Sequence, residues 1–226
     1  MRNITLIHPS RGRAELAGQA MRKWLSKCKH PNNVNYWLSL EADQLPVYRK
    51  YFDGENMLVG VNSNAVEAIN NAAKSVKFDI VVVMSDDFDC PLHWDEILLN
   101  AIGERTNFVL KTFDTTQHWI VTLPIMDNEY YQQFGYIYYP NFKHMFCDTW
   151  LTHVADLEKR LIVRNDIVFP HITSVTNNDS INAKNNATWN EGEALYLDLV
   201  KKSYPNNFQL NQHAKGHITW LKNKLK

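Results

Sequence analysis

The stretch Ile80-Val81-Val82-Val83-Met84, followed directly by Ser85-Asp86-Asp87-Phe88-Asp89, decides the fold class of this chain. An unbroken apolar run that includes three valines predicts a β-strand. The run does not alternate with polar residues, so we expect both faces of the strand to be covered, as in the middle of a parallel sheet. The aspartates that follow then stand where open α/β sheets bind their ligands, at the carboxyl end of a strand.

The residues around this strand alternate between strand and helix patterns. Further strands are predicted over residues 4–8, 34–40 and 57–61. Helices are predicted over residues 14–27, from Ser63 to about residue 76, and from Pro91 to residue 102. This alternation is typical of an α/β domain with a mostly parallel sheet flanked by helices.

The second half of the chain has a different pattern. Short strands are predicted over residues 108–113, 119–123, 136–139 and 167–169, with a helix over 147–160. Residues 173–188 are rich in Asn, Ser, Thr and Asp and predict a mobile loop. A helix over 189–201 and another from Gln212 are expected to end the chain.

Composition restricts the class of protein. The 226 residues carry 24 Lys plus Arg and 24 Asp plus Glu, and this balance disfavours a strongly basic nucleic-acid binder. The 45% hydrophobic content is typical of a globular chain, and the length predicts a single domain. Three scattered cysteines favour a reducing compartment, and no apolar run approaches the length of a membrane span, so we expect a cytoplasmic protein.

The aspartates after the central strand predict a metal site. Crowding Asp86, Asp87 and Asp89 is unfavourable unless something positive binds there. A hard divalent cation such as Mg²⁺ or Mn²⁺, bridging to a diphosphate, would remove that conflict. The alternative is a solvated turn with a helix cap, because aspartate is common in both.

Three other strands end in polar groups that we expect at the same edge of the sheet. The loop Pro9-Ser10-Arg11-Gly12-Arg13 follows the first strand, and its arginines suit a phosphate or a base. Asp43 follows the second strand and suits a base or a ribose. Asn64 follows the third, where its alternative role is a helix cap. Taken singly, the arginines are equally compatible with solvated loop positions, and Asp43 with a turn.

In this order, the segments resemble the inverting, family-2-like glycosyltransferases of the GT-A fold. Residues 4–13 are similar to their first strand and Pro-Ser-x-x-Arg loop, residues 64–73 to their next helix, and residues 81–87 to the strand before their Asp-x-Asp motif. Residues 134–136 and 147–150 resemble their acceptor-side segment. The resemblance covers about residues 3–171.

The resemblance implies a nucleotide-sugar donor, expected to be a UDP-sugar, held through Mn²⁺ or Mg²⁺. Asp87 and His171 are the implied metal ligands. The implied donor-binding residues come from four strand ends: Pro9, Arg11, Arg13, Asp43, Asn64, Ser85 and Asp86. Ser85 departs from the family, which has aspartate there, and this leaves open whether Asp89 also binds metal.

Asp148 is the implied general base, which would deprotonate the acceptor hydroxyl. Its alternative role is an acid that favours the dipole at a helix start. We expect residues 1–105 to form the nucleotide-binding half, 106–175 the acceptor half, and 176–226 a mobile loop and the C-terminal helices. Within the last of these, a loop over about 176–190 would close over the donor.

The acceptor and the reaction class stay open at this point. A glycan, a protein or a modified DNA base fits the acceptor role, and the sequence does not fix the oligomeric state. A nucleotidyltransferase that makes nucleotide sugars is one alternative, although residues 9–13 contain only one glycine for a phosphate loop. A non-catalytic sugar-binding or nucleic-acid-binding module is the other.

Overall fold

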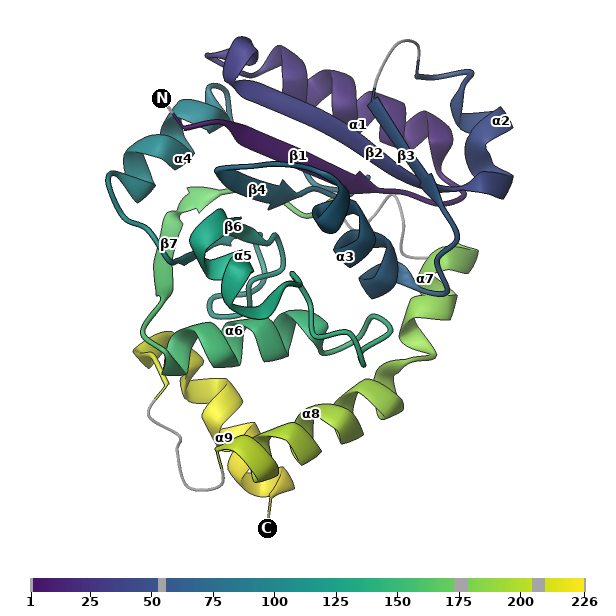
Figure 1. The fold of residues 1–226 in the computed structure, drawn as a ribbon. Coiled ribbons are helices and arrows are strands. Elements are labelled where there is room, and N and C mark those ends of the chain that lie inside the picture. Colours follow the sequence, from purple (N-terminus) through teal and green to yellow (C-terminus); the bar gives the residue numbers. More distant parts are fainter. Residues whose placement is uncertain (1, 53–55, 173–178, 205–209, 226) are drawn as a thin grey trace.

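A computed structural model describes residues 2–52, 56–172, 179–204 and 210–225. In these ranges one sheet has the strand order β3-β2-β1-β4-β6-β5-β7 (Figure 1). The strands are β1 Ile4–Pro9, β2 Val34–Glu41, β3 Asn56–Gly60, β4 Ile80–Val83, β5 Val109–Phe113, β6 Ile125–Asp127 and β7 Leu161–Val168. Only β6 runs against its neighbours β4 and β5, and the other neighbouring pairs are parallel. The predicted α/β class with a mostly parallel sheet is therefore confirmed.

Strand β4 is covered on both faces, as its apolar run predicts. Ile80 and Val82 belong to the core beneath α1 Ala14–Ser26 and α4 Trp94–Ile102. Val81 and Val83 belong to a second core beneath α3 Ala65–Ser75 and α6 Cys147–Leu157. The two helix layers hold the sheet rigid, so the loops after its strands have a fixed base.

The first half of the chain has the predicted order of elements, with small differences at helix starts. The cap of α3 is Asn64 rather than Ser63, because the Asn64 side chain accepts the N–H of Glu67 at 2.9 Å. Helix α4 begins at Trp94 rather than Pro91. Short helical turns, η1 Pro31–Asn33, η2 Ala42–Gln44 and α2 Leu45–Tyr48, flank β2.

For two segments of the second half, the prediction of a strand is wrong. Residues 119–123 and 136–139 are buried or partly buried, but they are irregular. Side chains bond their backbone groups where a neighbouring strand would otherwise do so. Thr152 Oγ1 accepts the N–H of Val121, and the Asn70 amide accepts from Ile137 and Tyr138 while donating to the Tyr138 carbonyl. An apolar pattern predicts that a segment is buried, but these buried segments do not form strands.

The prediction missed β6 and the short helix α5 Asn128–Phe134, and it placed only the end of β7. Asp127 joins the first two elements. Its carboxylate caps α5 by accepting the N–H of Tyr130 and also accepts the N–H groups of Asn107 and Phe108, beside β5. Strand β6 is short and has no long apolar run that would predict it. Hydrogen bonds to the buried Asp127 hold it beside β5 instead.

The predicted loop over 173–188 is partly wrong, because α7 spans Ser180–Asn186. Asp179 caps this helix by accepting the N–H of Asn182 at 2.8 Å, and Asp179 also pairs with Arg13. Asn and Ser have weak helix propensity, so the sequence hides a helix that tertiary contacts hold. Residues 173–178 of the predicted loop lie outside the described residues.

The chain ends with α8 Trp189–Ser203, the turn η4 Gln212–Ala214 and α9 Lys215–Lys224, which lie below α6 in Figure 1. Gly192 permits the close approach of α8 to the preceding chain, since a Cβ there would stand 2.3 Å from the carbonyl oxygen of Met145. Both helices were predicted. Within the described ranges, no helix combines the length and the apolar character that a membrane crossing requires.

Candidate functional site

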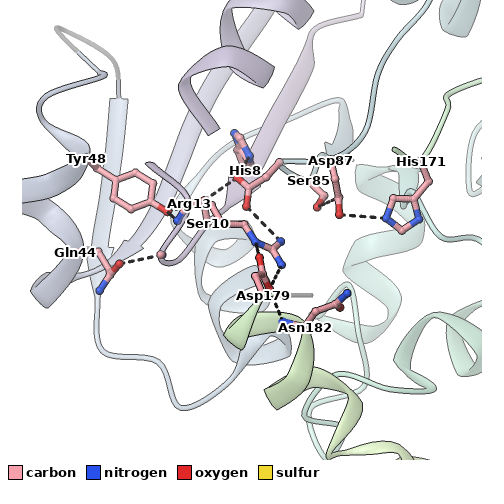
Figure 2. Close-up of polar contacts among 12 residues, drawn as sticks. His8, Ser10, Arg13, Gln44, Tyr48, Ser85, Asp87, His171, Asp179 and Asn182 are labelled. Carbon is pink, nitrogen blue, oxygen red and sulfur yellow. Dashed lines mark hydrogen bonds and ion pairs between the residues drawn. The ribbon is translucent and has the colours of Figure 1, made fainter. Parts of the chain in front are cut away.

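The carboxylate of Asp87 meets the ring of His171 just beyond the carboxyl end of β4 (Figure 2). Its Oδ2 atom lies 3.3 Å from His171 Nε2, and its Oδ1 accepts a 2.7 Å hydrogen bond from the Ser85 hydroxyl. The N–H of Ile172 donates to the Asp87 carbonyl, and Phe88 pairs and stacks with His171. Two segments distant in sequence therefore bring a carboxylate and an imidazole together.

Asp86 points the other way, into a buried polar network at the end of β1. Its Oδ1 accepts from the Ser10 hydroxyl at 2.7 Å and from His8 Nε2 at 3.0 Å. His8 is fully buried, and its Nδ1 lies 2.8 Å from the Tyr36 hydroxyl. Asp86 is thus held by the protein, and it fixes the turn that presents the neighbouring Asp87.

Arg13 makes ion pairs with Asp86 and with Asp179, the cap of α7, and Figure 2 shows the contact with Asp179. Its Nε and one terminal nitrogen bond both carboxylate oxygens of Asp179, at 2.5 and 2.9 Å, and another terminal nitrogen is 3.7 Å from Asp86 Oδ2. Desolvation lowers the pKa of Arg13, but the Asp179 bond and the charges of Asp86, Asp179 and Asp87 raise it overall. The guanidinium therefore stays charged beside three carboxylates.

Arg11 and Asp43 also meet at this edge, where they bind each other. The Arg11 guanidinium makes contacts of 2.8 Å with Asp43 and 3.1 Å with Glu41. Hydrogen bonding to Glu41 leads the causes that raise the pKa of Arg11. Pro9 ends β1 directly before this loop, in register with β2. The predicted edge thus holds a solvent-accessible charged pair.

Asn64 lies at the start of α3, where capping uses its side-chain oxygen. Glu67 completes a reciprocal arrangement by accepting the N–H of Ser63 at 2.7 Å. The capping role considered from the sequence is therefore present. A donor-binding role for Asn64 stays a prediction.

Asp89 turns away from Asp87 toward helix α1. Its carboxylate pairs with Lys23 at 2.6 Å and Lys27 at 2.8 Å, and it accepts the N–H of Cys90. Burial alone would raise the pKa of Asp89, but the bonds from both lysines lower it overall. This carboxylate is thus neutralised by two lysines of helix α1.

Asp148 stands in the first turn of α6 and is half-buried. Its Oδ1 accepts the N–H of Thr149 at 2.7 Å. Desolvation raises the pKa of Asp148, and the charge of Asp114 raises it further. Asp114 follows β5 and its backbone carbonyl accepts the N–H of His171, so the candidate base shares a neighbourhood with the metal candidates.

The sequence prediction missed two histidines, His8 and His144. Burial has the largest effect on the pKa of His144 and lowers it. The charge of Arg13 lowers this pKa further, and the charge of Asp87 raises it. His144 therefore lies within reach of both charges. A polar His8 inside an apolar strand was a signal that could have been used, whereas nothing in the sequence around His144 marks it.

A pocket of about 480 Å³ lies beside these residues rather than over Asp87. The start of α1, Val47, Tyr51 and Asp179 line it, and Arg13 forms part of its wall. Arg13 and Asp179 thus line this pocket, and Arg13 also pairs with Asp86 beside Asp87. Two carboxylates, Glu15 and Asp179, line this pocket, whereas Asp87 and His171 do not.

Within the described ranges, no group of three His, Cys, Asp or Glu side chains is placed to hold a metal ion unaided. Asp87 and His171 supply one oxygen and one nitrogen donor. Magnesium and manganese sites in phosphate-handling enzymes often use only one or two protein ligands and complete the shell with phosphate oxygens and water. The pair fits such a shared site and does not fit a closed structural one.

No protein-family model matches the sequence, and no curated protein matches it. Solved structures do match. The chain superposes on the mannosyltransferase PcManGT from Pyrobaculum calidifontis, solved with GDP-Man and Mn²⁺, with a TM-score of 0.66. Sequence identity is 13%, over 99% of this chain and 70% of that one.

The S. aureus protein TarS gives a second match. A TarS fragment, residues 1–349, in complex with UDP superposes with a TM-score of 0.59 and 15% identity, over 99% of this chain and 80% of the fragment. Against a longer TarS chain the score is 0.58, and this chain spans 42% of it. At such identities the likeness establishes the fold: the chain has the GT-A-like fold of these glycosyltransferases.

Proposed function

We propose that this chain is a metal-dependent glycosyltransferase, which moves a sugar from a nucleotide-diphosphate sugar to an acceptor hydroxyl with inversion. The observation that carries the proposal is the Asp87–His171 pair at the carboxyl edge of the sheet, with Arg13 nearby. The fold supports it, because the neighbours that share it were solved with GDP-Man and Mn²⁺ or with UDP.

In this proposal Asp87 and His171 hold Mn²⁺ or Mg²⁺. When bound, the ion would offset the negative charge of the diphosphate. Ser85 and Asp86 position Asp87, and the Arg13 guanidinium donates to diphosphate oxygens in a bidentate manner. The charges of Arg13 and Asp87 also act on the pKa of His144.

The nucleoside end of the donor is proposed to lie over Pro9, Arg11, Asp43 and Asn64. Asp43 supplies a carboxylate acceptor and Arg11 a donor, and uracil presents the complementary N–H and carbonyl groups. We therefore keep a UDP-sugar as the proposed donor. Residues 1–105 form the nucleotide half and residues 106–175 the acceptor half.

Asp148 is the proposed general base. The acceptor hydroxyl gives its proton to the Asp148 carboxylate while its oxygen bonds to the anomeric carbon of the donor sugar. The bond from that carbon to the diphosphate breaks, and the electron pair leaves with the diphosphate. The raised pKa of Asp148 makes its carboxylate a stronger base.

The acceptor is proposed as a hydroxyl of a glycan, a protein or a modified DNA base. The cytoplasm is the proposed compartment, supported by three cysteines that are free thiols in the structure.

Calorimetric titration of UDP and GDP, with Mn²⁺ or with EDTA, tests the proposal. We expect Mn²⁺-dependent binding to the native chain and a loss of at least about tenfold in affinity for Asp87→Ala. Asp89→Ala is the matched control from the same turn and should bind like the native chain, because Asp89 pairs with lysines of α1. Binding indifferent to both Mn²⁺ and Asp87, or no binding at all, would overturn the proposal.

A further inference from the structure

The charge of Asp87 acts on the guanidinium of Arg13, yet the bidentate position of this guanidinium is already taken. Asp179 occupies two of its nitrogens with two carboxylate oxygens, at 2.5 and 2.9 Å. A phosphate group binds arginine in the same two-pronged way. The Arg13 side chain is only 13% exposed, so little of it is left for a second anion.

The local charge sets an incoming diphosphate in competition with Asp179 for Arg13. The charges of Asp86, Asp179 and Asp87 all act on Arg13. A diphosphate that arrives adds further negative charge to a neighbourhood that already has an excess of it. Even with a divalent cation at Asp87, a diphosphate can make a bidentate contact with the Nε edge of Arg13 only if Asp179 releases that edge.

The helix that carries Asp179 is lightly attached. None of the residues of α7 is buried. The described contacts that fix its start are the Arg13–Asp179 pair and the side chain of Ile181, which lies against Gly12. Elements with few buried contacts open at low free-energy cost. Helix α8 has its own anchors, such as Lys143–Glu191 and the Gly192 contact.

We propose that the Asp179 carboxylate occupies the position on Arg13 that the diphosphate of the donor takes on binding, and that Asp179 thereby sets donor affinity. This inference rests on the proposed function. Donor binding exchanges one bidentate partner of Arg13 for another and releases the start of α7. Ligands with a diphosphate therefore compete with Asp179, whereas a nucleoside without phosphates does not.

The substitution Asp179→Asn tests the inference with little change of shape. Asparagine is as good a helix cap as aspartate, so the start of α7 should persist. Removing the charge should tighten the binding of UDP and of inorganic pyrophosphate by about tenfold in the presence of Mn²⁺. Uridine affinity should stay the same, because uridine has no phosphate.

Two further variants test whether the gain in affinity depends on Asp179 and on its contact with Arg13. Asp198→Asn removes an exposed carboxylate that also pairs with a lysine, Lys202, and it should leave UDP affinity unchanged. In the double variant Arg13→Gln/Asp179→Asn, the gain should vanish relative to Arg13→Gln alone, because the site of competition is gone.

Hydrogen exchange gives a readout that affinity alone does not. UDP with Mn²⁺ should speed exchange of the α7 amides in the native chain and should change them less in Asp179→Asn. If the native chain binds UDP and Asp179→Asn binds it equally or more weakly, the inference is wrong while the proposed function stands. If no variant binds UDP, GDP or pyrophosphate, both fall.

Discussion

Two polar clusters of this molecule differ in charge: one contains several charged side chains, and the other is neutral. The rim cluster (Arg13, Asp86, Asp87, His171 and Asp179) lies at the carboxyl edge of the sheet and sets three carboxylates against one guanidinium. The C-terminal clasp (His153, Tyr196 and His217) joins α6, α8 and α9. In the clasp, the Tyr196 hydroxyl lies 2.7 Å from His153 Nδ1 and 2.6 Å from His217 Nε2.

The clasp avoids charge, because it is enclosed by aromatic rings. His217 stacks on Trp119 with 4.5 Å between ring centroids, and Trp150 and Trp220 pack against Tyr196. Burial lowers the pKa of His153 and of His217 to about 4, so both rings are neutral at pH 7. The rim cluster gathers acidic and basic side chains, of which Arg13, Asp179 and His171 are partly exposed. The excess of acidic side chains thus distinguishes the proposed binding site from the neutral clasp.

Asp148→Asn should have the largest effect, because Asp148 is the proposed general base, on the same helix as His153 of the clasp. An amide cannot accept the acceptor proton, so turnover should fall by about 10²- to 10⁴-fold while UDP affinity and the melting temperature stay near native. Initial rates with donor and acceptor, with calorimetry and a thermal melt, measure all three.

The matched control lies on the same helix. Asp156 accepts hydrogen bonds from Trp119 Nε1 at 2.8 Å and from the N–H of Asn211 at 2.7 Å. Asp156→Asn should therefore lower the melting temperature and leave turnover per folded molecule unchanged. A large fall in turnover for Asp156→Asn, or none for Asp148→Asn, would contradict this division of roles.

The central strand and its flanking helices could be predicted because their signal is local. An unbroken apolar run such as 80–84 specifies burial on both faces whatever surrounds it. Residues 119–123 and 136–139 show the limit of that signal. Their backbone groups are satisfied by Thr152 and Asn70, and a side chain distant in sequence leaves no trace in the local pattern.

The site could be predicted only as far as strand ends specify position. Asp87 and His171 lie together, and Arg11 lies beside Asp43, because parallel strands end at one edge. The partner of Arg13 could not be predicted. Asp179 is distant in sequence and caps a helix that its asparagine-rich composition conceals, so only the tertiary structure reveals the pair.

Acid should unfold the clasp before it affects the core of the sheet. The pKa of His153 and of His217 is about 4 in the folded chain, against 6.5 as the ordinary value. Between these values the unfolded chain binds more protons than the folded one, so the free energy of unfolding falls as pH drops from 6.5 toward 4. The loss should reach a few kcal/mol at most.

Urea unfolding at several pH values measures this loss. His217→Gln should flatten the profile between pH 6.5 and 4, even if the variant is less stable at every pH. His213→Gln, at an exposed position near the start of α9, should keep the native profile. An unchanged slope in His217→Gln would show that the acid sensitivity arises outside the clasp.

Tyr196→Phe should have the smallest effect of the three and should test whether the clasp is purely structural. The substitution keeps the ring, which packs between Phe146 and Trp150, and removes only the hydroxyl. Both histidine nitrogens then lose a partner inside the core, which should cost about 1–3 kcal/mol in the free energy of unfolding at pH 7.

The proposed donor site should not respond to that loss. Tyr196→Phe should bind UDP with native affinity at 15 °C, because none of its described contacts reaches Arg13, Asp87 or His171. It should also leave α7 exchange unchanged when UDP is absent. A weakened UDP affinity in a folded variant would mean that the two clusters are coupled through α8, and the neutral clasp would then belong to the functional site as well as to the scaffold.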